Sequence, residues 1–267
     1  MTVAMNLART LAIVVCALAG APALGQMVLP GAVDASRPGA SVAAPNLKKI
    51  ARMRPAALAG VVGQTLALNG SSGALVLAKQ GEALRIEKLA LRGEAISNSA
   101  QICEISVVGK EPIVAKSLGR PEGSERFEAE IPACPFTFDI LAGAVSVPPQ
   151  TSACIFKAAD CQASAGGLWG PPLAALATQA KAVERARNRA ELALAANVKA
   201  LAADKTAPAR ARAAGLARDQ TRFAADRDEA CRDYVGEATY GFCAASLTQA
   251  RATALGAQVA ALKAERQ

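Results

Sequence analysis

The residues of this chain that could perform chemistry are its cysteines and carboxylates, because the 267-residue sequence contains no histidine. Without an imidazole the chain lacks the usual general base, the commonest metal ligand and the base of Ser-His and Cys-His nucleophile systems. Carboxylates could still exchange protons as a pair, but none lies in a glycine-rich or cleft-like context. The sequence therefore predicts a protein that is not an enzyme and that holds no metal or other cofactor.

Seven cysteines are present, and one of them, Cys16, lies in an expected export signal. The remaining even number is typical of disulfides in an exported chain, and no Cys-x-x-Cys pair indicates thioredoxin-like exchange. These six residues are Cys103, Cys134, Cys154, Cys161, Cys231 and Cys243. Their connectivity stays open, although proximity in the sequence favours pairing each with its nearest neighbour: the first with the second, the third with the fourth, and the fifth with the sixth.

Residues 1–25 are predicted to be a secretory signal peptide. Arg9 supplies the positive start, Leu11 to Leu18 the apolar core, and Ala23-Leu24-Gly25 a small-x-small cleavage site. The apolar core is shorter than the roughly 20 residues that span a bilayer. We expect an exported protein, in the periplasm or alternatively secreted, with no transmembrane span in the mature chain.

Basic residues outnumber acidic ones, which gives a formal net charge of +8 and a pI near 9.3. This balance predicts attraction to anionic surfaces such as lipid headgroups or acidic envelope polymers. Aromatic residues make up 3% of the chain, too few for the stacking platforms of single-strand nucleic-acid binders. For an exported chain, nucleic acid is therefore not an expected partner.

Residues 26–55 are rich in Gly, Pro, Ala and Ser and are predicted to be a flexible leader. The strands and helices that position the cysteines and carboxylates follow it. Residues 56–149 then alternate apolar and polar positions, as in Phe127, Ala129 and Ile131, and turn signals such as Pro121-Glu122-Gly123 separate the runs. This pattern predicts a small β domain in which Cys103 and Cys134 lie in different strands.

Residues 150–172 are predicted to form a loop-rich junction that contains two cysteines, several glycines and prolines, and the only tryptophan, Trp169. Two interpretations of Trp169 are open. It is either a packing anchor beneath the start of the next helix or an exposed contact for a protein partner, a role in which tryptophan is over-represented.

From residue 173 to 267 apolar residues recur at helical spacing, Pro208 interrupts the run, and Gly236 and Gly241 mark a turn. The pattern predicts an antiparallel helical hairpin or three-helix domain, with Cys231 leaving one helix and Cys243 entering the next. The expected fold class is α+β, a small N-terminal β-rich domain followed by this disulfide-containing helical domain.

One helical face in this segment carries Gln220, Phe223, Arg227 and Cys231, which step by three, four and four residues. We expect Phe223 to be a core ring, Gln220 to hydrogen-bond across the hairpin, and Arg227 to need a partner on the inward face. The neighbouring Asp228 is expected to meet the residue at i+4, Arg232, rather than Arg227.

This register resembles the LprI-type domain, a family of exported helical modules named for lysozyme inhibition. The resemblance covers about residues 160–262, and it implies a helical fold with protein-binding activity and lysozyme as a partner. The residues that match the family motif are Gln220, Phe223, Arg227, Asp228, Cys231, Cys243, Thr248, Arg251 and Leu255.

Two functions are therefore predicted. The first is an exported protein-binding module of the cell envelope, and lysozyme inhibition is its most specific form. Its partner-binding residues would be Trp169 and acidic side chains such as Asp226 and Asp233. The alternative is a structural envelope protein that adheres to anionic lipid or cell-wall polymer. Residues 171–267 carry 15 basic against 10 acidic residues, and this positive charge opposes the approach of a basic lysozyme.

Overall fold

Alternating burial along the chain shows why the first part of this protein forms strands. In the computed structural model, which describes residues 53–150, 152–203 and 207–264, the residues of β7 (Phe136–Leu141) and β6 (Arg126–Ala129) turn alternately toward and away from the core. The strands predicted from period-two patterns around these residues are confirmed. All described residues belong to one compact unit that begins at residue 46.

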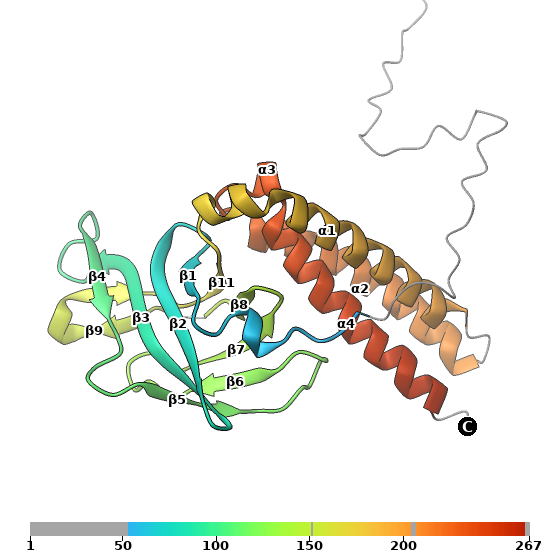
Figure 1. The fold of residues 1–267 in the computed structure, drawn as a ribbon, viewed down its shortest axis with the longest axis horizontal. Helices are drawn as coiled ribbons and strands as arrows, with labels where there is room; N and C mark the ends of the chain where they lie inside the picture. Colours follow the sequence, from blue (N-terminus) through green and yellow to red (C-terminus); the bar gives the residue numbers. More distant parts are fainter. Residues whose placement is uncertain (1–52, 151, 204–206, 265–267) are drawn as a thin grey trace, which may run out of the picture. The chain divides into compact units, whose positions relative to one another are not determined.

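Eleven strands are described, and they pair with one another in antiparallel fashion (Figure 1). Besides β6 and β7 they are β1 (Thr65–Leu68), β2 (Ser72–Gln80), β3 (Ala83–Ala95), β4 (Ile102–Ser106), β5 (Ile113–Ser117), β8 (Ala144–Val147), β9 (Cys154–Phe156), β10 (Cys161–Ala163) and β11 (Gly167–Gly170). Of two short 3-10 helices, η2 (Leu58–Gly60) precedes β1 and η3 (Lys157–Ala159) lies between β9 and β10.

Eight of the strands close into a ring, in the order β1, β2, β3, β5, β6, β7, β8 and β11, with β11 returning to β1. The predicted fold class, α+β with a small N-terminal β-rich domain, is wrong, because these strands form a closed antiparallel barrel. Its closing strand comes from residues 150–172, the stretch expected to be a loop-rich junction. Ala67 pairs with Gly170, about 100 residues away, and a period-two pattern contains no information on such a partner.

The interior of the barrel is filled by apolar side chains, as expected for a ring of eight strands. Ile86 and Ile140 are fully buried, and Phe127 stacks on Phe138 with 5.6 Å between ring centres. Trp169 belongs to the same core at 1% exposure, and its indole Nε1 donates to the Ala165 carbonyl at 2.9 Å. The described barrel is therefore a packed core.

Strand β3 is longer than its neighbours and continues past the ring, where β4 pairs along one side and β10, followed by β9, along the other. Cys103 of β4 lies opposite Gly93, and Cys161 of β10 lies opposite Ala95, so the two cysteines share one face of the sheet. They form a disulfide with 5.7 Å between their Cα atoms.

A second disulfide joins Cys134, just before β7, to Cys154 of β9. The predicted pairings of Cys103 with Cys134 and of Cys154 with Cys161 are therefore wrong. Strand register, and not distance along the chain, decides which sulfur atoms meet. Three disulfides in the described residues, including Cys231–Cys243, fit a protein that passes through an oxidising compartment.

Four helices follow the barrel: α1 (Leu173–Ala202), α2 (Ala207–Cys231), α3 (Glu237–Tyr240) and α4 (Phe242–Ala264). The prolines at 171 and 172 follow β11, and Pro172, with extended backbone, is the residue directly before α1. Helices α1 and α4 make the most extensive helical contact, with Ala190 and Ala252 fully buried. Asn197 of α1 donates from Nδ2 to the Ala252 carbonyl at 2.8 Å.

Within the described ranges, no helix combines the length and the apolar character needed to cross a bilayer. The predicted signal peptide, residues 1–25, and residues 26–52 of the predicted leader lie outside the described residues.

Candidate functional site

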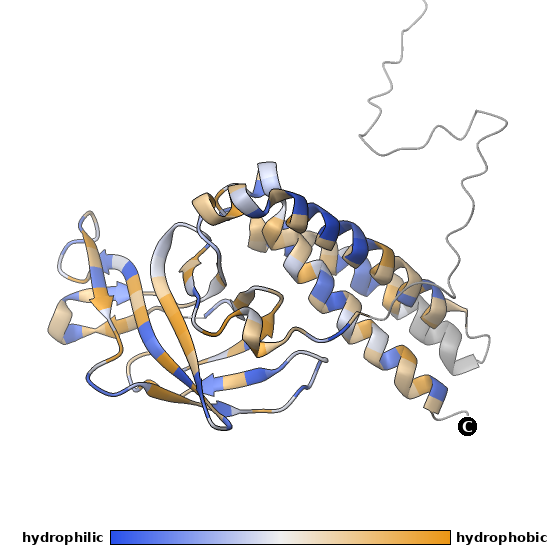
Figure 2. Ribbon diagram, viewed as in Figure 1, coloured by the Kyte–Doolittle hydropathy of each residue, from blue (hydrophilic) through white to orange (hydrophobic). Residues whose placement is uncertain are grey.

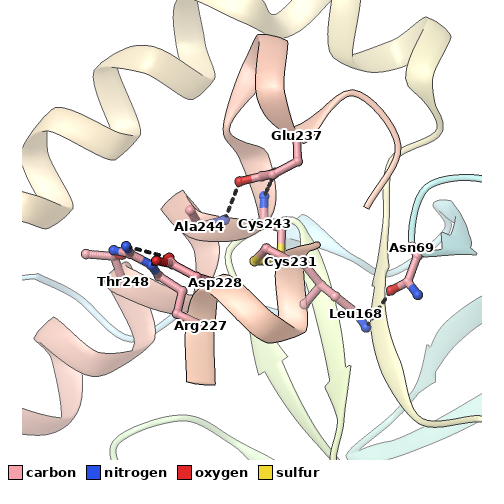
Figure 3. The surroundings of a disulfide bond; sticks show 9 residues. All are labelled: Asn69, Leu168, Arg227, Asp228, Cys231, Glu237, Cys243, Ala244 and Thr248. Carbon is pink, nitrogen blue, oxygen red and sulfur yellow. Dashed lines mark hydrogen bonds and ion pairs between the residues drawn. A yellow bond between two sulfur atoms is a disulfide. The ribbon is translucent and has the colours of Figure 1, made fainter. Parts of the chain in front are cut away.

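The turn between α2 and α4 is built by two glycines and a disulfide (Figure 3). Gly236, with φ 78°, and Gly241, with φ 64°, occupy the left-handed region on either side of the four-residue helix α3. This sharp path returns the chain so that Cys243 meets Cys231, with 5.5 Å between their Cα atoms. The pairing expected for these two cysteines is present.

Glu237 caps the first turn of α4 (Figure 3). Its carboxylate accepts hydrogen bonds from the backbone N–H groups of Cys243 at 2.8 Å and Ala244 at 2.9 Å. The first amides of a helix lack intrahelical partners and carry partial positive charge, so a carboxylate there stabilises the helix. This acidic residue therefore serves the fold rather than a partner.

Tyr234 ties this turn to the barrel. Its hydroxyl donates to the Pro171 carbonyl at 2.9 Å, and its ring lies 5.6 Å from that of Phe242. Burial raises the pKa of Tyr234 above its ordinary value, and the negative charge of Glu237 adds to the effect. Beside it, the Val235 N–H donates to the Asn69 carbonyl at 2.9 Å, which gives the turn a second bond to the barrel.

The motif residues meet in one place between α2 and α4. The ring of Phe223 lies between two guanidinium groups, with its centre 6.0 Å from Cζ of Arg227 and 5.7 Å from Cζ of Arg251. The Gln220 amide is assigned the orientation that satisfies its hydrogen bonds, in which its oxygen accepts from Arg251 Nε at 3.1 Å and Nη2 at 3.0 Å. Gln220 thus bonds across the hairpin as expected, but Phe223 is half-buried beneath cations and is not the core ring that we predicted.

Arg227 has two partners (Figure 3). Nη1 donates to the Thr248 hydroxyl at 3.3 Å, while Nε and Nη2 donate to the Asp228 carboxylate at 3.0 and 2.8 Å. The predicted contact of Asp228 with Arg232 is therefore wrong, and Arg232 pairs with Glu229 instead. The long arginine side chain can curl around the helix to its sequence neighbour, which spacing rules for short side chains do not describe.

We call this group of six residues the α2–α4 cluster: Gln220, Phe223, Arg227, Asp228, Thr248 and Arg251. Thr248 and, one turn beyond Arg251, Leu255 are each 1% exposed. The structure thus brings the motif residues together: the Gln220–Arg251 and Arg227–Thr248 hydrogen bonds join α2 to α4, and the Arg227–Asp228 pair lies within α2. Their geometry is that of a helix–helix joint.

The three residues predicted to bind a partner are not brought together. Asp226 and Asp233 are exposed on α2 and in the turn after it. Trp169 is buried inside the barrel, so its interpretation as an exposed contact is wrong. The other interpretation made Trp169 a packing anchor beneath the start of α1. The indole is a packed core residue, but its neighbours are those of the barrel core.

Beside the α2–α4 cluster lies a groove of about 550 Å³. One wall is α4, the other is the β5–β6 loop with parts of β7 and β8, and Phe223 and Arg251 belong to both the groove and the cluster. The residues that line the groove are Arg120, Pro121, Glu122, Gly123, Ser124, Asp139, Leu141, Ser146, Phe223, Leu247, Ala250, Arg251, Ala254, Ala257, Gln258 and Ala261.

The two walls of the groove differ in chemistry. The α4 wall is mainly apolar, with Leu247 followed by alanines. The opposite rim carries paired charges, since Arg126, beside the groove, meets Asp139 at 2.7 Å and Glu122 at 3.7 Å. The hydrogen bond to Asp139 raises the pKa of Arg126 above its ordinary value. The groove therefore offers apolar contact on one side and ion-paired contact on the other.

Sequence reasoning missed this groove. The stretch Pro121-Glu122-Gly123 was interpreted only as a turn. A signal was nevertheless present in the spacing of Ala250, Ala254, Ala257 and Ala261, which lie four, three and four residues apart on one face of α4. Small residues on a helical face leave room for a groove.

The described residues hold no group of three cysteine or carboxylate side chains arranged to bind a metal ion. Comparison of the chain with protein-family models, with curated proteins and with solved structures found no match.

Proposed function

We propose that this chain is an exported, non-catalytic protein-binding module of the cell envelope, which holds a segment of its partner in the groove between the β5–β6 loop and α4. The observation that carries the proposal is the groove itself. Its volume of about 550 Å³ lies within the roughly 300–1,000 Å³ of typical binding sites. Its mixed lining suits a peptide segment, which presents apolar side chains and polar backbone together.

The groove has walls that resist collapse. On one side the closed barrel and the Arg126–Asp139 pair fix the strands behind the β5–β6 loop. On the other side the Cys231–Cys243 disulfide and the Gln220–Arg251 contact fix α4 against α2. A preformed site loses less entropy on binding than a mobile one, so these joints favour affinity.

Lysozyme is the first partner to test. The resemblance of the α2–α4 motif to the LprI-type family supports this choice, and the exposed Asp226 and Asp233 supply carboxylates for a basic protein. Because the helical segment is positively charged overall, association with lysozyme would depend on short-range contacts rather than on long-range attraction. Three disulfides support a periplasmic location.

The experiment is a cell-wall lysis assay with the full chain purified from the periplasm of an expression host. We expect lysozyme activity to fall at near-stoichiometric ratios of protein to enzyme. Undiminished lysis at a large excess would reject lysozyme as the partner.

A pair of matched variants tests the groove. Ala257 is exposed and lines the groove, so Ala257→Trp fills the site with little strain on the core. Ala217, exposed on α2, does not line it, and Ala217→Trp is the control. We expect Ala257→Trp to weaken inhibition by about tenfold or more, a loss of roughly 1.4 kcal/mol, and the control to inhibit normally. Equal inhibition by both variants would reject the groove as the contact.

A further inference from the structure

The outer face of α1 carries a row of basic side chains, which we call the cationic stripe: Lys181, Arg185, Arg189 and Lys199. All four are exposed. With about 100° of rotation per residue, their positions fall within a sector about 80° wide, and with a rise of 1.5 Å per residue the row is about 27 Å long. Figure 2 shows that the middle turns of α1 are mainly hydrophilic.

The carboxylates of α1 lie outside this sector. The helix has five basic and two acidic residues, and Glu191 is engaged on the flank by Arg187, with 3.7 Å between Nε and Oε1. The opposite side of α1 holds the buried Val183 and Ala190, which pack inward. Glu184 and Glu191 are exposed on the flank, and the sector of the cationic stripe itself contains no acidic residue.

One apolar side chain interrupts the charges. Leu192 lies between Arg189 and Lys199 along the stripe and is 52% exposed. An exposed leucine alone is ordinary. A leucine flanked by cations matches the surface of a bilayer, where lysine and arginine reach headgroup phosphates and an apolar side chain enters the acyl boundary. A soluble polyanion would engage the cations but would offer no apolar layer to the leucine.

We propose that the cationic stripe docks this protein on an anionic phospholipid bilayer, with Leu192 inserted among the headgroups. The charge complementarity of the stripe and the position of Leu192 carry the proposal. It concerns a different surface from the groove on α4 and does not depend on the groove.

The first test is co-sedimentation of the full chain with vesicles. We expect binding to phosphatidylcholine vesicles that contain about 30% phosphatidylglycerol at about 0.05 M salt, with the loss of binding above about 0.2 M salt as the charges are screened. Pure phosphatidylcholine vesicles should bind little protein. If the chain ignores the anionic vesicles at low salt, the proposal is overturned.

Two variants with the same loss of charge locate the surface. The first replaces all four stripe residues with glutamine. The control replaces four exposed lysines of the barrel segment with glutamine: Lys79, Lys88, Lys110 and Lys157. The stripe variant should partition on the order of a hundredfold or more less strongly, while the control keeps most of its binding. Equal losses of vesicle binding by the two variants would mean that net charge alone drives binding, and would overturn the proposal that the cationic stripe is the docking surface. Circular dichroism checks that both variants keep their helices.

Leu192→Trp separates a lipid surface from a soluble polymer. Trp169 is buried in the barrel and gives a constant background, so a blue shift of the added emission on mixing with anionic vesicles reports insertion. Polyglutamate, an anionic polymer without an apolar layer, is the comparison. A blue shift with vesicles alone supports the proposal, whereas vesicle binding without any shift, or binding to polyglutamate alone, overturns it.

Discussion

Gln220 and Arg251 meet across the interface of α2 and α4, where one amide oxygen accepts from two nitrogens of one guanidinium group, at 3.1 and 3.0 Å. The same guanidinium group has its Cζ atom 5.7 Å from the centre of the Phe223 ring. A single glutamine thus positions a cation that both joins two helices and lines the groove on α4.

Arg251→Lys should lower the free energy of unfolding by about 1–2 kcal/mol, because an ammonium group cannot form the two-point contact with the Gln220 oxygen. Urea unfolding followed by circular dichroism measures the change. Arg218, exposed on α2, provides the matched substitution Arg218→Lys, which should change stability by less than about 0.5 kcal/mol. Equal effects of the two variants would contradict the role assigned to the Gln220–Arg251 contact.

Removal of a disulfide should destabilise the protein more when the loop that the disulfide closes is longer. Replacing both Cys231 and Cys243, which are 12 residues apart, with serine should cost about 3 kcal/mol. Replacing both Cys103 and Cys161, which are 58 residues apart, should cost about 4 kcal/mol. Denaturant unfolding of the two double variants under non-reducing conditions gives both values.

Mass spectrometry of peptides from the unreduced protein provides the accompanying check on connectivity. Peptides containing Cys103 should be linked to Cys161, and those containing Cys134 to Cys154. Recovery of Cys103 linked to Cys134 would contradict the register of β3, β4 and β10. No free thiol is expected at the six paired positions before reduction.

Glu237→Ala should cost about 1–2 kcal/mol, because two amides at the start of α4 lose a charged acceptor. Thermal unfolding is a suitable measurement, and hydrogen exchange of the Cys243 and Ala244 amides gives a local readout that should accelerate. The control is Glu229→Ala, which removes an exposed carboxylate paired with Arg232 and should change stability by less than about 1 kcal/mol. Unchanged hydrogen exchange of the Cys243 and Ala244 amides in Glu237→Ala would contradict the assignment of Glu237 as the cap of α4.

Stability should decline above about pH 10 because of Tyr234. The unfolded chain loses the phenolic proton near the ordinary pKa of 10, whereas burial raises the pKa of Tyr234 in the folded chain and keeps the proton bound. Below pH 10 both states hold the proton and the contribution is constant. Above it the free energy of unfolding should fall by up to about 1.4 kcal/mol per pH unit.

The variant Tyr234→Phe isolates this effect. It should start about 1 kcal/mol less stable at neutral pH through loss of the hydrogen bond to Pro171, and its alkaline decline should be shallower. Tyr240→Phe provides the comparison for loss of a hydroxyl in the same turn. Urea unfolding at pH 7 to 11.5 supplies the data, and identical slopes for wild type and Tyr234→Phe would contradict the assignment.

The positions of strands and helices followed from periodicity, whereas the closure of the barrel did not. Alternation identifies Phe136 and Phe138 as inward residues of one strand, but it contains nothing about which strand lies beside them. The closing strand β11 is four residues long and is flanked by glycines and prolines, which are ordinary loop signals. The disulfides were mispaired for the same reason, since the meeting of Cys103 with Cys161 depends on the register around Gly93.

The candidate site was predictable only in its helical half. The spacing of Gln220, Phe223 and Arg227 correctly placed them at a helix–helix contact, because that contact follows from helical geometry. The groove needs the β5–β6 loop, more than 100 residues earlier in the chain, to lie opposite α4. Periodicity describes one element at a time and cannot bring these two walls together.

The pairing of β1 with β11 also determines when the barrel can close during synthesis of the chain. Until residues 167–170 have left the ribosome, the ring stays open and both of its edge strands are exposed. We therefore expect incomplete chains that end before β11 to need protection from aggregation or proteolysis. A fragment that ends at residue 149 should not fold, and the barrel and the helices should be studied as one chain.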